Sequence, residues 1–242
     1  MHEYDGGFVF LGAGENEQPA LWKLQGSTLS RLSTTTIQDQ LADFTDTEIA
    51  AAFTWVSGVG GAYFINLTVG NSTFSYDSTA SALAGKKIWH NKVSFINEAK
   101  VRNRVNSAVT AYGRVLVGDS VSGRIGELDR DTYTEYGTAI NRVNTTQSLT
   151  NLNDEATLGE IELNIEAGVG DATTTDPQIS LAISYDGVVF NNPRPRSMGK
   201  VGERSTRCIW NQNGMLTTQA VFEWTMSDPV KAVLRGLTVW VD

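Results

Sequence analysis

The sequence contains little of the chemistry on which most enzyme classes depend. It has one cysteine and two histidines in 242 residues, so it can form no internal disulfide, and the clustered Cys and His residues of zinc sites are missing. Histidine-dependent catalysis would have to use His90, because His2 lies at the terminus. We expect Cys208, in the strand-like segment TRCIW, to be a small buried apolar residue. The sequence therefore predicts no catalytic residues, no metal site and no cofactor.

Long apolar stretches are also missing. The sequence contains no run of about 18 apolar residues, the length that a membrane-spanning helix needs. The first residues, MHEYDGG, have neither the basic nor the apolar region of a signal peptide. The net charge of −8 argues against nucleic-acid binding through a general basic field. The charge is unevenly distributed, since residues 1–50 carry two bases and eight acids, whereas residues 184–207 carry five bases and two acids. This uneven charge would suit head-to-tail assembly of several copies, and solvated surface charge is the simpler alternative.

The sequence is rich in Ser, Thr, Asn and Gly, which favours an all-β protein with many turns. Three segments repeat a pattern of strand, polar turn, strand, turn and short strand: residues 6–34, 60–86 and 112–138. Gly7, Gly61 and Gly113, at the first of these strands, are 54 and 52 residues apart. A period near 50 residues with several strands per copy predicts β-propeller blades, which bury their faces against neighbouring blades.

The first repeat differs from the other two. Copies two and three follow the apolar segments AAFTWVSG (51–58) and NSAVTAYG (106–113), and copy one has no such preceding strand. Propellers usually have at least about four blades. We therefore expect the propeller to continue upstream of residue 1, with an open stack that closes against a second chain as the alternative.

The pattern changes after residue 140. The polar segment 141–157 predicts a linker, and the segments GEIELNIEAG, PQISLAISYDG and TQAVFEWTM then alternate apolar and polar residues, as half-buried strands do. VKAVLRGLTVWV is apolar on both faces, which is typical of a strand in a packed interior. The predicted fold is all-β: a partial or complete β-propeller over residues 1–140, the linker, and an antiparallel β-sandwich of five or six strands over 158–242.

Two acidic motifs invite a functional interpretation. Ser184-Tyr185-Asp186-Gly187 resembles the turn of sugar-cleaving propellers, but Asp-Gly is also a hairpin signal, and the Asp carboxylate can accept the N–H groups of its own turn. We expect a structural turn. Asp129 and Asp131 have a spacing that could serve calcium, yet the loop supplies too few oxygen ligands for about six to eight contacts, so we expect a blade turn.

The basic segment NNPRPRSMGKVGERSTRC offers a candidate interaction surface. Pro193 and Pro195 stiffen the backbone around Arg194 and Arg196, so the two guanidinium groups would be presented to a ligand at low entropic cost. We expect Arg194, Arg196 and Lys200 to contact a partner protein or a neighbouring subunit. A solvated loop is the alternative.

Four motifs occur in order in the C-terminal part: EAGVG (166–170), DPQISLAISYDG (176–187), SMGKVGERSTRCIW (197–210) and SDPVK (227–231). Together they resemble the packaged-DNA stabilisation proteins, or tail-hub accessory factors, of short-tailed bacteriophages. The resemblance covers residues 158–242 well and the blade-like region less specifically. The family's turn commonly reads Asp-Asp-Gly-Gly followed by Trp, whereas this turn is one residue shorter and is followed by Phe190.

The resemblance implies a structural virion protein without enzymatic activity, made in the host cytoplasm and located in the short tail. It implies a ring-like homo-oligomer, a hexamer in the family, that closes the channel beneath the portal and its adaptor and so retains the packaged DNA. Its partners would be the portal-adaptor protein, the tail needle and the tailspikes, with no membrane involved. The alternative is a carbohydrate-recognising propeller, either a receptor-binding tail protein or a glycosidase-like fragment. That function needs exposed aromatic residues beside carboxylates; Trp22, Trp55 and Trp89 are candidates, although strand alternation favours core positions for them.

Overall fold

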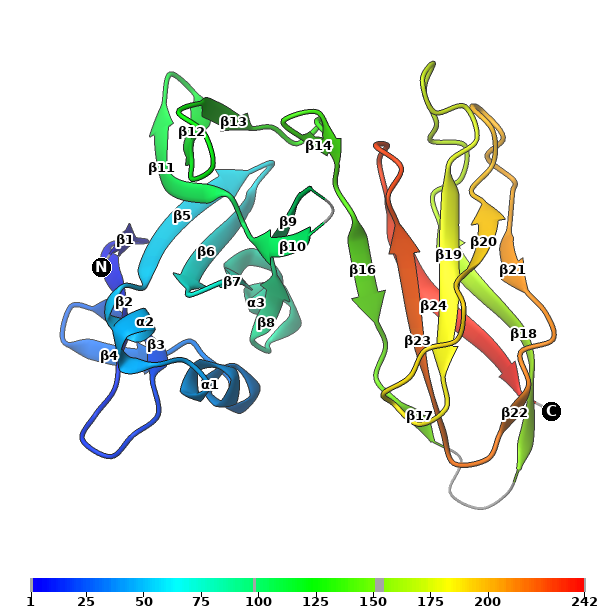
Figure 1. Cartoon of the computed structure of the whole chain (residues 1–242), viewed down its shortest axis with the longest axis horizontal. Helices are drawn as coiled ribbons and strands as arrows, with labels where there is room; N and C mark the ends of the chain where they lie inside the picture. Colours follow the sequence, from blue (N-terminus) through cyan, green and yellow to red (C-terminus); the bar gives the residue numbers. More distant parts are fainter. Residues whose placement is uncertain (1, 98, 151–154, 242) are drawn as a thin grey trace. The chain divides into compact units, whose positions relative to one another are not determined.

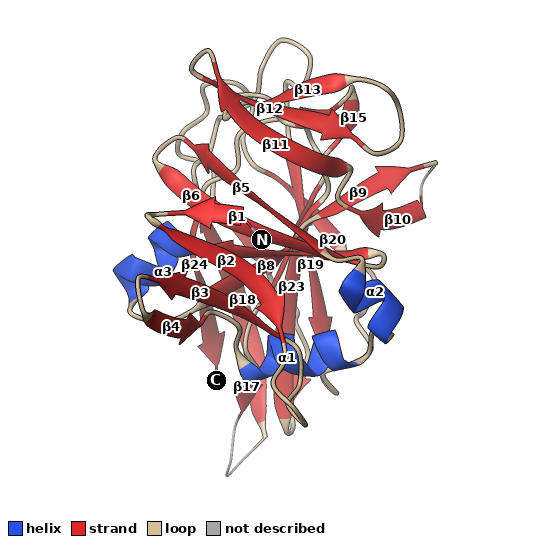
Figure 2. Ribbon diagram, turned by 90° about the vertical axis from the view of Figure 1, so that its left-hand side faces the viewer, coloured by secondary structure: helices blue, strands red, loops and turns tan. Residues whose placement is uncertain are grey.

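The computed structural model describes residues 2–97, 99–150 and 155–241, and the chain divides into two compact units, Met1–Thr132 and Tyr133–Asp242. Both units consist mainly of antiparallel strands (Figure 1). Three short helices occur in the described part of the first unit (Figure 2). The predicted all-β class is confirmed.

The first unit contains three main sheets, which we call blades 1, 2 and 3. Blade 1 consists of β1 (His2–Tyr4), β2 (Gly7–Gly12), β3 (Ala20–Gln25) and β4 (Thr28–Arg31). Blade 2 consists of β5 (Phe53–Val59), β6 (Ala62–Val69), β7 (Ser72–Asp77) and β8 (Ile88–Asn91). Blade 3 consists of β11 (Val105–Ala111), β12 (Arg114–Asp119) and β13 (Ile125–Leu128), and the hairpin β9 (Val93–Ile96) to β10 (Ala99–Arg102) precedes it.

The first two strands of each blade are joined by a two-residue turn. Both turn residues have positive φ in all three blades, as type I′ hairpins require: Asp5-Gly6, Gly60-Gly61 and Tyr112-Gly113. The equivalent glycines are therefore Gly6, Gly61 and Gly113. Gly7, which the sequence analysis aligned with Gly61 and Gly113, follows the turn glycine of blade 1 by one residue. The expectation that blade 1 lacks a first strand is wrong, because β1 pairs with β2. Its three residues are too few to show a periodic pattern.

Blades 1 and 2 pack face to face, and so do blades 2 and 3. Between blades 1 and 2 the core includes Val9 and Leu21 on one side and Ile65 and Leu67 on the other, all fully buried. Between blades 2 and 3, Trp55 packs with apolar residues of blade 3: Val105, Val115 and Val117. The three predicted repeats are thus successive members of one stack.

The helices of the first unit, α1 (Thr35–Ala42), α2 (Asp46–Ala50) and α3 (Ser78–Ala84), were not predicted. The Thr34 hydroxyl caps α1 by accepting the N–H of Ile37, and Thr45 with Glu48 forms a capping box on α2. The segment DFTDTE (43–48) therefore contains the C-cap of α1 and the start of α2. Helices this short carry too few turns for a clear 3.6-residue pattern.

The face of blade 2 that meets blade 3 carries buried polar residues beside Trp55. Ser57, Asn66 and Ser75 are almost fully buried there. Lys92 extends over this face and places its ammonium 5.2 Å from the ring centre of Trp55 and 4.7 Å from that of Phe64. Burial lowers the pKa of Lys92 from 10.5 to about 8, and the Asp77 carboxylate opposes this only in part.

The second unit is a β-sandwich. One sheet consists of β16 (Arg142–Thr145), β23 (Gln219–Met226), β19 (Gln178–Ser184) and β20 (Arg194–Ser197), with β17 (Leu149–Thr150) also paired to β23. The other consists of β21 (Cys208–Trp210), β18 (Ala156–Ile165), β22 (Met215–Leu216) and β24 (Leu234–Val241). A small hairpin, β14 (Thr134–Glu135) and β15 (Thr138–Ala139), precedes them.

The alternation predicted for the sandwich strands is confirmed. The inward residues of β18 and β19 are almost completely buried: Ile161, Leu163, Ile165, Ile179, Leu181 and Ile183. On β23, Ala220, Phe222 and Met226 are buried and Trp224 packs against the same core. Cys208 is also buried in this core, as predicted.

Two parts of the sandwich differ from the prediction. Residues 142–145 and 149–150, assigned to a linker from the sequence, form β16 and β17 on β23, while 151–154 lie outside the described residues. Three of the four β16 residues are exposed, so the strand has little apolar pattern. The prediction that the last strand is packed on both faces is wrong. β24 pairs only with β18 at a sheet edge, and Trp240 is 43% exposed.

Replacing Lys92 with methionine tests whether burial of its charge between blades 2 and 3 destabilises the fold. Below about pH 8 the folded chain holds a buried charge that the unfolded chain holds in water, so we expect Lys92→Met to raise the free energy of unfolding at pH 7 by roughly 3 kcal/mol. This difference should shrink as the pH rises from about 8 to 10.5. Urea titrations at several pH values measure it, with the exposed Lys100→Met as the control. A difference that does not change with pH would contradict this interpretation.

Candidate interaction surface

Arg194 and Arg196 lie on the edge strand β20 and not in a loop. Their cross-strand partners on β19 are Leu181 and Ile179, whose side chains enter the core, so both arginines start from the inner face of their sheet. Pro195 lies between them on a strand that pairs on one side only, where a missing N–H is tolerated. The two guanidinium groups therefore extend across the open edge of the sandwich toward the second sheet.

The Arg194 guanidinium joins the two sheets. Its Nη1 donates to the carbonyl of Asn211 at 3.1 Å and its Nη2 donates to the side-chain oxygen of Asn213. The Trp210 indole returns a hydrogen bond to the Arg194 carbonyl at 2.7 Å. Because these bonds connect β20 to β21 and the segment after it, Arg194 holds the sandwich edge closed. This structural role could not be predicted from local sequence.

Arg196 and Lys200 are more accessible. Arg196 is exposed, and its Nε donates to the carbonyl of Ile209 at 2.9 Å. Lys200 is exposed in the turn after Gly199, with its backbone N–H donating to the Glu203 carboxylate at 3.0 Å. Among the described residues, no acidic side chain forms an ion pair with either of these two bases. The structure therefore leaves their charges unneutralised by the chain itself.

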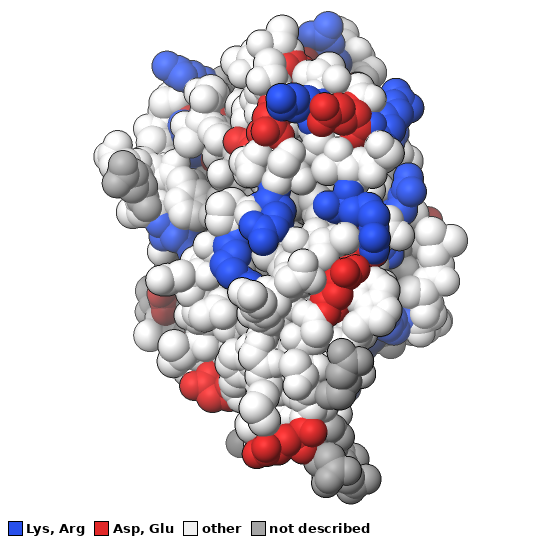
Figure 3. Space-filling view, turned by 90° about the vertical axis from the view of Figure 1, so that its right-hand side faces the viewer, with Lys and Arg blue, Asp and Glu red and all other residues white. Residues whose placement is uncertain are grey.

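A third base of this segment, Arg207, is neutralised locally. Its guanidinium donates to Glu162 at 2.6 and 2.8 Å and to Glu160 at 3.2 Å. The hydrogen bonds with Arg207 lower the pKa of Glu162, and the same interaction raises the pKa of Arg207. Basic and acidic side chains are interspersed over the face shown in Figure 3. The excess of positive charge in the sequence segment is thus smaller on the folded surface.

The Asp186 turn is structural, as predicted. Its Oδ1 accepts the N–H groups of Val188 and Val189 and the hydroxyl of Ser184, each at 2.8 Å. These bonds lower the pKa of Asp186. Gly187 follows with a φ of 79°. The connection from β19 to β20 is longer than a tight Asp-Gly hairpin, and Val188 and Val189 are exposed at it.

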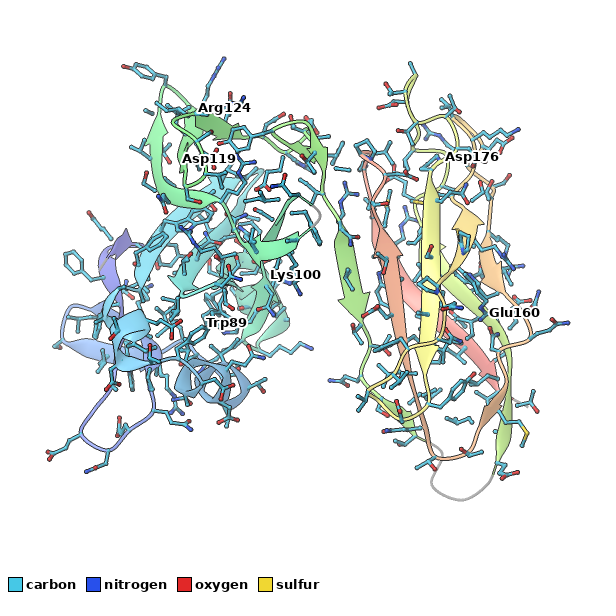
Figure 4. All side chains as sticks on the ribbon, in the orientation of Figure 1. Trp89, Lys100, Asp119, Arg124, Glu160 and Asp176 are labelled. Atoms are coloured by element: carbon cyan, nitrogen blue, oxygen red, sulfur yellow. The ribbon has the colours of Figure 1, made fainter. Side chains whose placement is uncertain are left out.

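Asp119 is the most strongly perturbed carboxylate of the first unit (Figure 4). The Arg104 guanidinium holds the pKa of Asp119 well below its usual range, with additional hydrogen bonds from the Ser122 hydroxyl and the Val121 N–H. The Asp119 side chain is fully buried. A carboxylate that is saturated with donors and inaccessible to solvent stabilises its turn and is poorly suited to proton transfer.

The other candidate reactive groups are also placed unfavourably for catalysis. Burial raises the pKa of the Cys208 thiol to about 11, so it carries no thiolate at neutral pH. The His90 ring lies 3.9 Å from the Asp77 carboxylate, beyond hydrogen-bond length. Ser75, opposite His90 on β7, is completely buried. These residues do not form an accessible nucleophile–base pair.

Metal and membrane sites were sought among residues 2–97, 99–150 and 155–241. No group of three or more His, Cys, Asp or Glu side chains there could hold a metal ion. The Asp129 carboxylate instead accepts the Thr132 hydroxyl at 2.7 Å in its own turn. None of the helices in this part of the chain is long and apolar enough to cross a membrane.

The tryptophans named for carbohydrate binding do not form one platform. Trp55 is only 2% exposed, whereas Trp22 and Trp89 are half-buried and donate to the carbonyls of Gly12 and Leu32. Trp89 (Figure 4) lines a hollow of about 340 Å³ together with Lys87 and His90. No carboxylate lines this hollow within the part of the chain that the structure describes.

The blades and the β-sandwich define the chain as an all-β protein of two units. Residues 1–133 match the family model described as bacteriophage P22 Gp10, β-propeller, and residues 141–242 match the model described as bacteriophage P22 Gp10, β-sandwich. The chain belongs to this family of phage structural proteins, which confirms the resemblance and the propeller-plus-sandwich fold predicted from the sequence.

Solved structures give a weaker likeness. An exo-β-1,3-galactanase from Phanerochaete chrysosporium with galactose is 10% identical, with a TM-score of 0.26, over 97% of this chain and 68% of that chain. A glycoside hydrolase family 43 arabinoxylan arabinofuranohydrolase from Bacillus subtilis, in complex with cellotetraose, is 9% identical with a TM-score of 0.26 over 98% and 52%. Likenesses at this level carry no functional argument. No curated protein sequence matches the chain.

Replacing Arg194 tests whether it closes the sandwich edge. We expect Arg194→Ala to lower the free energy of unfolding by about 2 kcal/mol, because it removes two charge-assisted hydrogen bonds between the sheets. The exposed Lys200→Ala, a few residues away, should change it by less than about 0.5 kcal/mol. Urea unfolding followed by tryptophan fluorescence measures both. Equal stabilities for the two variants would contradict a structural role for Arg194.

Proposed function

We propose that the chain is a hub and plug of a phage short tail. In this function it docks under the portal-adaptor complex, retains the packaged DNA and links to the tail needle and tailspikes. The observation that carries the proposal is the match of both units, residues 1–133 and 141–242, to the propeller and sandwich of one phage structural family.

The surface charge of the chain is consistent with a plug that does not hold DNA along its length. A net charge of −8 gives long-range repulsion from the phosphate backbone. A protein beneath the channel could then block the exit sterically and still release the genome without breaking many phosphate contacts. Retention by a closed channel needs rigid subunits, and sheets packed face to face supply rigidity.

The contacts of such a hub would be spread over protein surfaces. We propose Arg196 and Lys200 as contacts with a neighbouring subunit or a partner protein, because both are exposed and neither is neutralised by an acid of its own chain within the described residues. Arg194 would support them by fixing the edge strand that presents Arg196. A ring-like homo-oligomer, a hexamer in the resemblance, would repeat these contacts around the tail axis.

This proposal makes the function structural and not catalytic, and it locates the protein in the short tail of the virion. The family match supports it. So does the environment of three candidate reactive groups, because Cys208 and Ser75 are buried and the buried Asp119 carboxylate is paired with Arg104. The described residues offer stable surfaces for assembly more readily than a reactive centre.

DNA retention tests the proposal directly. Particles assembled in a host without this protein should package DNA and then lose it, as measured by nuclease-protected genome copies after purification. Added wild-type protein should restore retention, and so should Arg235→Ala, which removes an exposed base from β24. The double variant Arg196→Ala, Lys200→Ala should need about tenfold more protein for the same retention. Particles that stay full but fail to adsorb to cells would contradict the plug and favour host recognition.

A further inference from the structure

Three buried side chains with polar atoms cross blade 2 on the face that meets blade 3, and we call them the polar row. Trp55 on β5, Asn66 on β6 and Ser75 on β7 are cross-strand neighbours, and none is more than 2% exposed. Within the part of the chain that the structure describes, the Trp55 indole N–H, the Asn66 side-chain oxygen and the Ser75 hydroxyl have no hydrogen-bond partner. The Asn66 side-chain nitrogen donates to the Trp55 carbonyl at 3.3 Å, which orients the amide. Since buried polar atoms are nearly always hydrogen-bonded, the polar row indicates a bound ligand or water.

Lys92 adds a positive charge to the polar row. Its backbone N–H donates to the Thr73 carbonyl at 2.8 Å, so the residue starts from the β8 side of the blade. Its ammonium lies 5.2 Å from the ring centre of Trp55 on β5 and 4.7 Å from that of Phe64 on β6, so the side chain crosses β7 and β6. Among the described residues, no carboxylate forms an ion pair with this ammonium. Its neighbours are aromatic rings, which accept no ordinary hydrogen bond from its three N–H groups.

The other charged groups near this face do not neutralise the ammonium. The Asp77 carboxylate acts on it only from beyond ion-pair distance. One Asp77 oxygen caps α3, and the other lies 3.9 Å from the His90 ring. Arg102 adds a second cation, with its guanidinium 5.6 Å from the ring centre of Phe53, on the same face of β5 as Trp55. Two cations therefore lie near one carboxylate that already caps a helix.

The Lys92 side chain is accessible from the surface. It lines a hollow of about 400 Å³ together with Thr73 and Lys100 (Figure 4). Asp43 is the acidic residue among those that line this hollow. A small ion thus has access to Lys92 in the folded chain.

We infer that a small monovalent anion of the chloride type binds between Lys92 and the polar row. The unpartnered donors are the ammonium, the Trp55 indole and the Ser75 hydroxyl, whereas the Asn66 oxygen is an acceptor only. An anion accepts from all three donors, and its charge offsets that of Lys92. Because a buried site removes the hydration shell of its ligand, chloride should bind and the strongly hydrated fluoride should not. The anion would connect Lys92 to β5 and β7.

Thermal unfolding of the full chain in two salts tests this inference. Strongly hydrated anions stabilise proteins in general, so fluoride should raise the Tm at least as much as chloride if there is no site. With the site, we expect the wild-type Tm to be about 3 °C higher in about 100 mM sodium chloride than in equal sodium fluoride. Lys92→Met should abolish this difference, and Ser75→Ala, which removes one donor, should reduce it. Lys100→Met, which changes the other lysine of the hollow, should keep it.

The line width of the chloride NMR signal measures binding directly, because exchange with a bound state broadens the signal. Wild type and Lys100→Met should broaden it equally, and Lys92→Met should lose more than half of the broadening. Equal broadening by all three chains would mean that only surface ions bind. A Tm that is no higher in chloride than in fluoride would mean that water alone occupies the polar row. Either result overturns the inference, and neither bears on the proposed function, which does not depend on this site.

Discussion

The structure depends on the covering of one β-sheet face by another. A strand pair satisfies its backbone groups within the sheet, but the apolar side chains on its faces gain stability only against a second layer. The first unit meets this requirement by stacking blades, so that Val9, Ile65 and Leu67 share one core. The second unit meets it by closing two sheets over Trp210 and Phe222.

Charged side chains serve this arrangement by closing its edges and turns. Arg194 and Arg196 donate hydrogen bonds to carbonyl groups of the opposite sheet and the segment after it. Asp119 and Asp186 accept hydrogen bonds from residues of their own turns. These interactions use charges that could otherwise mark a reactive site. Lys92 is the exception, because burial on a polar blade face leaves its ammonium with aromatic rings as neighbours. These charged groups thus mainly stabilise the fold of the chain itself.

Much of this fold could be predicted from the sequence where one face of a strand is exposed to solvent and the other is buried. The two-residue period of β18, β19 and β23 makes Leu163, Leu181 and Phe222 core residues without any knowledge of the partner sheet. The Asp186 turn was predictable because its hydrogen bonds are local. Short or edge elements were not predictable: β1, β16 and the three helices are too short for a period, and β24 has apolar residues on both faces although only one is covered.

The residues of the candidate surface could be predicted from the sequence, but the contacts that they make could not. The sequence marks Arg194, Arg196 and Lys200 as a basic group, but the register with β19 decides that the first two turn inward over the sandwich edge. Their acceptors, near residues 209–213, are more than ten positions away along the chain. Such long-range partners leave no local pattern. The same holds for Arg207, whose acidic partners lie on β18.

Cryo-electron microscopy of the intact phage particle tests the central claim, that this chain is an assembled structural component of the virion. The account predicts density for the blades and the sandwich in a ring below the portal, with every copy in contact with protein neighbours. Purified particles in which no such density occurs, and in which the chain is undetectable by mass spectrometry, would contradict it.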